Sequence, residues 1–281
     1  MCELFAMSSR QPSAVTYSLR EFAANGSALR SNRHGWGIAY THDRDAFTIK
    51  EPLSAADSPW VDFVAENSVK SKCVIAHVRH ATRGAHTLEN THPFRRVLGR
   101  QLHLFAHNGT LKDIEDACPA AMTYAPVGET DSELAFCLLL DRLKPLWLES
   151  GGPPPLADRM GLFRAFSAEM ATLGAANFLY FDGDALFVHA HRRIHEEEGR
   201  PTPPKPPGLQ IKDWSRSPVE PDYAPQGLRV DVHDPQTIML ASVPLDTAGW
   251  EPLPECTVLA VRDGAELMRE STTSQPVGPA L

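Results

Sequence analysis

Several features that would assign this sequence to common classes are missing. Its five cysteines are an odd number with no CxxC pair, so neither a disulfide framework nor a zinc ribbon fits their spacing. Apolar runs such as Leu134–Leu140 are far shorter than the ~20 residues that a membrane span needs. The formal net charge is −8 and no basic patch stands out. We therefore expect neither a membrane nor a nucleic acid as a partner.

The N-terminus also lacks the pattern of a signal peptide. It carries an early acid, Glu3, and reaches the polar residues Ser8 and Ser9 before an apolar stretch could form. A Gly-rich phosphate loop and a dinucleotide fingerprint are absent as well. We therefore expect a cytoplasmic protein that uses no cofactor.

What is present predicts helices interleaved with short antiparallel hairpins. Such a mixture favours an α+β layered domain over a parallel βαβ one. The dipeptides Asp182-Gly183 and Asp263-Gly264 are typical hairpin turns. Thr130 is a plausible helix N-cap, with Glu133 completing a capping box. The expected strands are Cys2–Met7, Gly35–Tyr40, Cys73–Thr82 and Leu102–Gly109, and the expected helices are Thr16–Leu29, Thr130–Leu148 and Ala157–Leu173.

The chain is expected to form a single domain over residues 2–270. Residues 196–226 are rich in proline and charge, which predicts a long surface loop, because the strand-like runs on either side look too short to fold alone. Residues 271–281 have the composition of a loose tail.

Cys2 is the sharpest candidate for chemistry. If the initiating methionine is trimmed, Cys2 becomes the N-terminus, and its thiol then lies beside its own α-amine. That amine titrates near ~7.7–8.0 in model peptides and can accept the thiol proton at neutral pH. A cysteine at this position is more often an ordinary strand residue, so the interpretation depends on the other groups.

Four further residues supply those groups. Asn108 and Gly109 end an expected strand, where a side-chain amide and a backbone N–H could stabilise an oxyanion; an Asn-Gly pair is otherwise a simple turn. Arg79 could hold an α-carboxylate through two parallel hydrogen bonds, or form a surface ion pair. Asp131 could pair with an α-ammonium, or simply be an acid favoured in a first helical turn. Together they would hold an amino acid while Cys2 attacks its side-chain amide.

Six runs carry these residues in an informative order: Met1-Cys2-Glu-Leu-Phe, Gly35-Trp36-Gly37, His77-Val-Arg79-His-Ala-Thr82, Asn90-Thr91-His92-Pro93-Phe94, His107-Asn108-Gly109 and Gly128-Glu-Thr-Asp131-Ser-Glu133. In this order they resemble the class II glutamine amidotransferases, a group of N-terminal-nucleophile (Ntn) hydrolases, and are most similar to the stand-alone YafJ-like branch. The motif-bearing resemblance covers roughly residues 2–140.

The resemblance implies a four-layer αββα sandwich of two antiparallel sheets between helical layers. It implies that Cys2 attacks the side-chain amide of glutamine through a γ-glutamyl thioester and releases ammonia. Asn108 and Gly109 would form the oxyanion hole, and glutamine would be bound by Arg79, Thr82 and Asp131. His92 matches a position that lines the site, although a buried structural histidine would fit equally.

The sequence departs from the family pattern in two places. Larger members commonly carry Trp where this chain has His80, which affects how the glutamine pocket is closed. Residues after 140 do not resemble a synthase that would consume ammonia. The expected substrate is therefore glutamine with an ammonia-accepting synthase partner on another chain, or a γ-glutamyl amide or peptide.

Two other classes remain open. A catalytically silent binding protein would result if Met1 stayed attached, because the amine of Cys2 would then be an amide. The twelve histidines suggest a second hypothesis, a metal-dependent hydrolase or metal-binding module. His189 and His191 would share one face of a strand. No carboxylate or cysteine follows them at ligand spacing, so we expect no metal.

Overall fold

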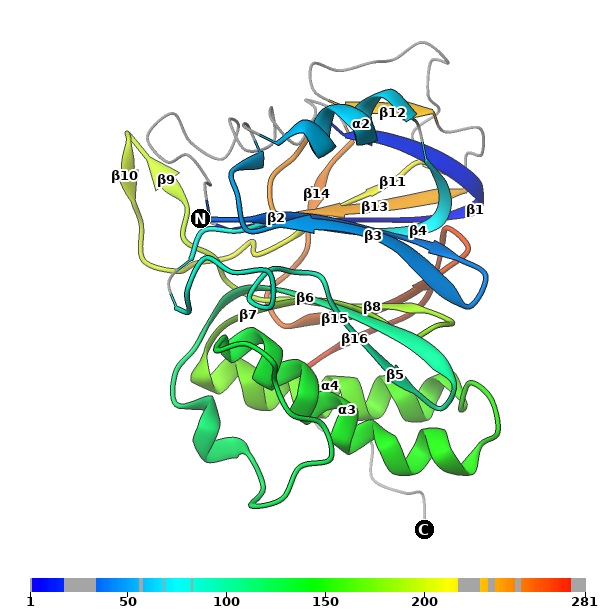
Figure 1. Ribbon diagram of the computed structural model, residues 1–281, viewed down its shortest axis with the longest axis vertical. Helices are drawn as coiled ribbons and strands as arrows, with labels where there is room; N and C mark the ends of the chain where they lie inside the picture. The colour runs from blue at the N-terminus through cyan, green and yellow to red at the C-terminus, as the bar shows by residue number, and fades with distance from the viewer. Residues whose placement is uncertain are drawn as a thin grey trace.

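The computed structural model describes residues 2–17, 34–55, 58–67, 69–81, 83–216, 228–231, 236–245 and 249–273. They form two antiparallel sheets that lie face to face, with helices on both outer faces (Figure 1). Among the described helices, none is both long and apolar enough to cross a membrane.

The larger sheet has eight strands and contains the N-terminal strand near its middle. Every pairing in it is antiparallel, and β12 pairs with β1 beside the main path. In sheet order the strands are β14 (Glu251–Pro252), β11 (Gln210–Asp213), β13 (Thr237–Ala241), β1 (Glu3–Tyr17), β4 (Lys70–Val78), β2 (Trp36–His42) and β3 (Asp45–Glu51), with β12 at Leu228–Asp231.

The smaller sheet has six antiparallel strands. Two further, very short strands form a separate hairpin. The hairpin consists of β9 (Glu196–Glu197) and β10 (Arg200–Pro201). In order, the six strands are β16 (Ala265–Ser271), β15 (Thr257–Arg262), β8 (Leu186–Ala190), β7 (Gly174–Phe181), β6 (Gln101–Leu111) and β5 (Phe94–Leu98).

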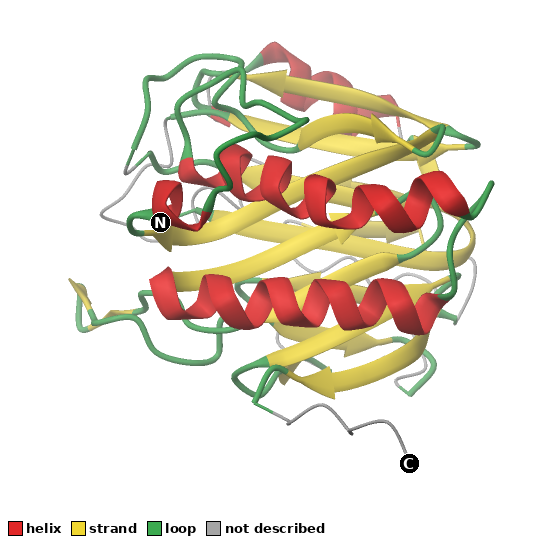
Figure 2. Ribbon diagram, turned by 90° about the horizontal axis from the view of Figure 1, so that it is seen from below, coloured by secondary structure: helices red, strands yellow, loops and turns green. Residues whose placement is uncertain are grey.

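The helices complete four layers. Helix α2 (Pro59–Asn67) packs on the larger sheet, while α3 (Asp131–Glu149) and α4 (Leu156–Leu173) lie side by side across the smaller one (Figure 2). A short 3-10 helix, η2 (Ile114–Ala117), follows β6. The expected α+β sandwich of αββα type is therefore confirmed.

Strand periodicity explains why both sheets are covered on two faces. In β1, Leu4 belongs to the core between the sheets, whereas Phe5 belongs to the core under α2. In β6, Leu104 faces the other sheet and Phe105 faces the helices α3 and α4. Because successive side chains point to opposite faces, a strand buried on both sides is continuously apolar.

Several local predictions are confirmed by the structure. Thr130 is the N-cap of α3, and its hydroxyl accepts from Glu133 N at 3.2 Å. The Glu133 side chain accepts from Gly128 N at 2.7 Å rather than from the N-cap itself. Asp182-Gly183 joins β7 to β8, and Asp263-Gly264 joins β15 to β16 with φ values of 49° and 70°.

The predicted helix Thr16–Leu29 is wrong at its start. Thr16 and Tyr17 extend β1, where Thr16 pairs with Arg229 of β12. Long-range pairing overrides the local helical pattern here, since β1 gains partners on both edges. Residues 18–33, which include the rest of the predicted helix, lie outside the described residues.

The predicted surface loop at 196–226 is only partly right. It contains the β9–β10 hairpin, but also β11, which pairs with β13 through Ile211 and Leu240. Leu209, Ile211 and Trp214 are buried, because this short segment completes the larger sheet. Residues 217–227 are outside the described ranges. The predicted tail 271–281 begins with Ser271, the last residue of β16, and residues 274–281 are not described.

Candidate active site

Cys2 lies where the start of β1 meets the end of β4. The antiparallel register pairs Glu3 with Val78, so Cys2 is adjacent to Arg79 and His80. The Sγ atom accepts a hydrogen bond from His80 N at 3.1 Å and can donate to His80 O at 3.3 Å. Burial raises the pKa of the Cys2 thiol, and the His80 backbone opposes this rise only in part. The thiol is thus the resting form, and attack requires a base.

Strand alternation brings Cys2 and Asn108 into one interlayer space from opposite sheets. Cys2 is two residues from Leu4, and Asn108 is four residues from Leu104, so each points to the same face of its strand as that leucine. Both leucines lie in the core between the sheets, so Cys2 and Asn108 are also directed there. Nδ2 of Asn108 donates to Cys2 O at 2.7 Å and to Ser242 Oγ at 3.1 Å. The structure therefore joins two candidates that are 106 residues apart.

Gly109 requires the absence of a side chain. A Cβ atom added there would lie 1.7 Å from Ala175 O on the neighbouring strand β7. Gly109 and Cys2 open onto a cavity of about 600 Å³. The cavity is lined by Cys2, His80, Asn108, Gly109, Thr110, Lys112, 171–175, 191–194 and Pro204.

Arg79 follows β4 and is 2% exposed. Its Nη1 atom donates to Ala85 O at 2.9 Å, and its Nη2 atom donates to Arg83 O at 2.9 Å and to Gly84 O at 3.3 Å. Burial lowers the pKa of Arg79, and the nearby Cys2 and Asp131 raise it. Arg79 is thus close enough to both residues to interact electrostatically, while its guanidinium is bound to the loop that follows it.

Asp131 begins α3 and is 6% exposed. Its Oδ2 atom accepts from Leu111 N at 2.7 Å, and its Oδ1 atom accepts from Ser132 N at 2.9 Å. The carboxylate therefore ties the end of β6 to the first turn of α3. Thr82, the remaining residue expected to bind glutamine, lies outside the described residues.

His92 is buried between other rings. Its ring centroid lies 4.1 Å from that of His77 and 4.4 Å from that of Phe94, and a cis peptide joins it to Pro93. Burial lowers the pKa of His92 far below its usual value. His92 is not among the described residues that line the cavity, which agrees with the structural alternative.

Sequence reasoning missed a polar group behind the nucleophile. Ser242 Oγ accepts from Leu4 N at 3.1 Å as well as from Asn108. Arg193 donates to Ser242 O, and its Nη2 atom lies 3.6 Å from Glu3 Oε1. No sequence pattern points to Ser242 or Arg193, because they come together behind Cys2 only when the chain folds. Glu3 did give a sequence signal, because it is an acidic residue inside an otherwise apolar strand.

With this geometry established, comparison with known proteins is informative. The family model described as "Glutamine amidotransferases class-II" matches residues 1–279. This chain belongs to the class II glutamine amidotransferases. YafJ of Escherichia coli K12 is 34% identical over 198 residues, which cover 69% of this chain and 75% of YafJ. A Haemophilus influenzae relative is 32% identical, over 69% of this chain and 65% of its own length.

Solved structures agree with this family membership. A Pseudomonas aeruginosa protein described as a predicted glutamine amidotransferase has a TM-score of 0.66 and 28% identity, covering 95% of this chain and all of that one. The glutamine phosphoribosylpyrophosphate amidotransferase of Bacillus subtilis has a TM-score of 0.56 and 17% identity, covering 98% of this chain and 50% of that one. The second likeness concerns the fold alone. The expected YafJ-like branch of the amidotransferases is confirmed.

Proposed function

We propose that this amidotransferase hydrolyses the side-chain amide of glutamine, with Cys2 as an N-terminal nucleophile. The observation that carries the proposal is the convergence of Cys2 and Asn108 from opposite sheets on one cavity. Removal of Met1 would provide the α-amine of Cys2 as the base. The raised pKa of the thiol makes such a base necessary at neutral pH.

In this mechanism the Cys2 Sγ atom adds to the amide carbon while the thiol proton passes to the α-amine. Gly109 N–H and Asn108 Nδ2 hold the resulting oxyanion. Nδ2 has two hydrogens, which now bond Cys2 O and Ser242 Oγ, so it must give up one of these acceptors to bind the oxyanion. The protonated amine then gives its proton to the leaving nitrogen, the C–N bond breaks, and ammonia departs from a γ-glutamyl thioester. Water attacks the thioester, which releases glutamate and restores the thiol.

Arg79 would bind the α-carboxylate, and Asp131 would balance the α-ammonium, with Thr82 completing the pocket. The Nη atoms of Arg79 now donate to the carbonyls of residues 83–85. A substrate carboxylate would have to replace some of these acceptors. The exchange is favourable because an Arg–carboxylate pair is stronger than a guanidinium bond to a neutral carbonyl.

Replacing Cys2 with alanine tests the central step. We expect Cys2→Ala to lower amide hydrolysis by roughly three orders of magnitude or more, because no other group can form the thioester. The fold should be retained, since the hydrogen bonds that the structure shows for Sγ involve only the His80 backbone. The measurement is ammonia release from glutamine, with circular dichroism to verify folding.

The matched control is Cys118→Ala, which removes a half-buried thiol just after η2 whose Sγ donates to Ile114 O. It should hydrolyse at the wild-type rate. Intact mass should show loss of Met1, and a protein with an uncleavable N-terminal extension should be inactive. Wild-type activity in Cys2→Ala or in the extended protein would refute the mechanism.

A γ-glutamyl peptide is the second candidate substrate. The cavity of about 600 Å³ has the size that accommodates drug-sized ligands, larger than glutamine needs. Lys112 on its wall would suit a leaving group that carries a carboxylate. Comparing ammonia release from glutamine with amine release from γ-glutamyl amides and peptides decides between them. If glutamine is preferred, a synthase on another chain would be the acceptor of the ammonia.

A further inference from the structure

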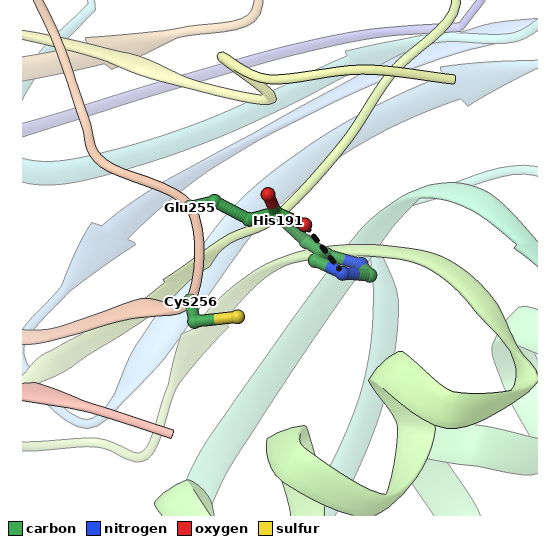
Figure 3. Close-up of side chains that lie close together, drawn as sticks. All are labelled: His191, Glu255 and Cys256. Carbon is green, nitrogen blue, oxygen red and sulfur yellow. Dashed lines mark ion pairs between the residues drawn. The ribbon is translucent and has the colours of Figure 1, made fainter. Parts of the chain in front are cut away.

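Three metal-binding side chains meet beside the cavity: His191, Glu255 and Cys256. His191 follows β8, and the other two precede β15 (Figure 3). These strands pair antiparallel with Thr257 opposite Ala190, so the end of one meets the start of the other. One ligand atom from each residue lies within 4.8 Å of the other two. The sequence did not reveal this group, because His191 lies more than sixty residues before the adjacent pair Glu255 and Cys256.

The distances suit a small tetrahedral ion. His191 Nε2 lies 3.3 Å from Glu255 Oε1. Zinc–nitrogen and zinc–oxygen bonds of about 2.0–2.2 Å at tetrahedral angles place two ligand atoms roughly 3.4 Å apart. The His191 and Glu255 atoms are thus already at ligand spacing. Cys256 is a free, half-buried cysteine whose Sγ lies within 4.8 Å of the other two ligand atoms.

His191 is held in place for such a role. The residue is 6% exposed, and its ring stacks on His189 with centroids 5.8 Å apart and planes tilted by 21°. Both this ring contact and the pairing with Glu255 restrict where the imidazole can lie. His191 also lines the cavity that contains Cys2, so the cluster lies at the wall of the candidate active site.

The chemistry of the three ligands favours zinc. Arg192 donates to the same Oε1 atom of Glu255 that faces His191. A zinc ion that binds Oε1 would therefore displace Arg192 to Oε2, the second oxygen of the carboxylate. Glu255 and the Cys256 thiolate carry two negative charges, and the Arg192 guanidinium already offsets one of them. A set of nitrogen, oxygen and sulfur ligands suits zinc better than magnesium or calcium.

We propose that His191, Glu255 and Cys256 bind one zinc ion at the wall of the Cys2 cavity, with water as the fourth ligand. On binding, the S–H bond of Cys256 breaks, a zinc–sulfur bond forms, and the proton passes to solvent. The site is separate from the amide chemistry of Cys2, so its existence does not depend on the proposed function.

The experiment uses the full chain, stripped of metal with a chelator and titrated with zinc or with cobalt as a spectroscopic probe. We expect one equivalent to bind, and the cobalt form to show a cobalt–thiolate charge-transfer band. Cys256→Ser and His191→Gln should each weaken binding by about a hundredfold or more and remove or alter that band. Glu255→Gln provides a third variant of nearly unchanged shape.

Two cysteine variants separate this site from other thiols. Cys2→Ala and Cys118→Ala should both keep the full stoichiometry and the band, since neither residue is a proposed ligand. Binding that is lost in Cys2→Ala but retained in Cys256→Ser would place the metal on the nucleophile and overturn the proposal. The proposal is also overturned if the wild-type protein binds no zinc or cobalt, or if all the variants bind the metal as tightly as the wild type. Thermal melts of the metal-free variants verify that each one is folded.

Discussion

Glu3, the neighbour of the nucleophile, is a carboxylic acid buried inside the larger sheet. It is 0% exposed, and in the part of the chain that the structure describes neither carboxyl oxygen has a hydrogen-bond partner. Arg193, with Nη2 3.6 Å away, supplies the facing positive charge. Burial outweighs this attraction and raises the pKa of Glu3 to about 7.

The raised pKa of Glu3 predicts a pH-dependent stability. The folded state holds the proton up to about pH 7, whereas the unfolded chain releases it near its ordinary value of 4.5. The stabilisation is therefore complete below pH 4.5, falls as pH rises toward 7, and is lost above it. The change is on the order of 2–3 kcal/mol. Urea unfolding at pH 5 and pH 8 measures it.

Glu3→Gln is the control, because it keeps the shape and removes the titration. The difference in unfolding free energy between wild type and Glu3→Gln should shift in favour of the variant as pH rises. Buried histidines such as His103, whose pKa is lowered to about 3, titrate in both proteins and cancel in this difference. An identical pH profile for the two proteins would contradict the assignment.

Among the elements, the loop that follows β4 links the motifs of the candidate site. Arg79 donates to Ala85 O, and Asn90 Nδ2 donates to the same carbonyl at 3.1 Å. Asn90 Oδ1 in turn accepts from Glu129 N at 2.8 Å, just before α3. A Cβ at Gly128 would lie 2.2 Å from that oxygen. One asparagine thus joins Arg79 to the start of the helix that carries Asp131.

The N-cap of α3 provides a test at this scale. Thr130→Ala removes the hydroxyl that accepts from Glu133 N, and should cost about 1 kcal/mol of stability. Because Asp131 is the next residue, activity should fall by more than stability alone explains. Chemical denaturation and amide hydrolysis measure the two effects. Thr130→Ser keeps the acceptor and should restore both, so an equal loss in both variants would exclude the cap as the cause.

At the scale of the molecule, the two sheets share one apolar layer. Leu4, Ile75 and Leu240 contribute to it from the larger sheet, and Leu104 and Val188 from the smaller one, all at 0% exposure. Neither sheet can bury this face alone. The expected single domain over residues 2–270 follows from this shared layer and remains a prediction.

We predict that the chain unfolds in one cooperative transition. Calorimetric and van't Hoff enthalpies should agree, and Leu104→Ala should lower the unfolding free energy by about 2–5 kcal/mol while leaving one transition. Leu53→Ala, at a side chain that is 57% exposed, is the matched control and should change little. Two separate heat-absorption peaks would show that the sheets unfold independently.

Local patterns were sufficient for features that depend on near neighbours. The cap at Thr130 and the turn Asp263-Gly264 could be predicted because their hydrogen bonds and backbone angles involve residues within a few positions. The motifs also identified Cys2 and Asn108, and strand parity explains why both point between the sheets. The prediction for residues 196–226 missed β11, because four residues among prolines carry no distinct period and gain stability only from β13.

The sequence by itself determined the family, the layered fold and the candidates for chemistry, because these rest on motifs and periodicity. Only the tertiary structure decided which groups meet. Ser242 reaches Asn108 across 134 residues, and His191 reaches Glu255 and Cys256 across a strand pair. The binding of the Arg79 guanidinium by its own loop is likewise visible only in the folded chain. Such contacts depend on strand register and loop closure, which local sequence does not encode.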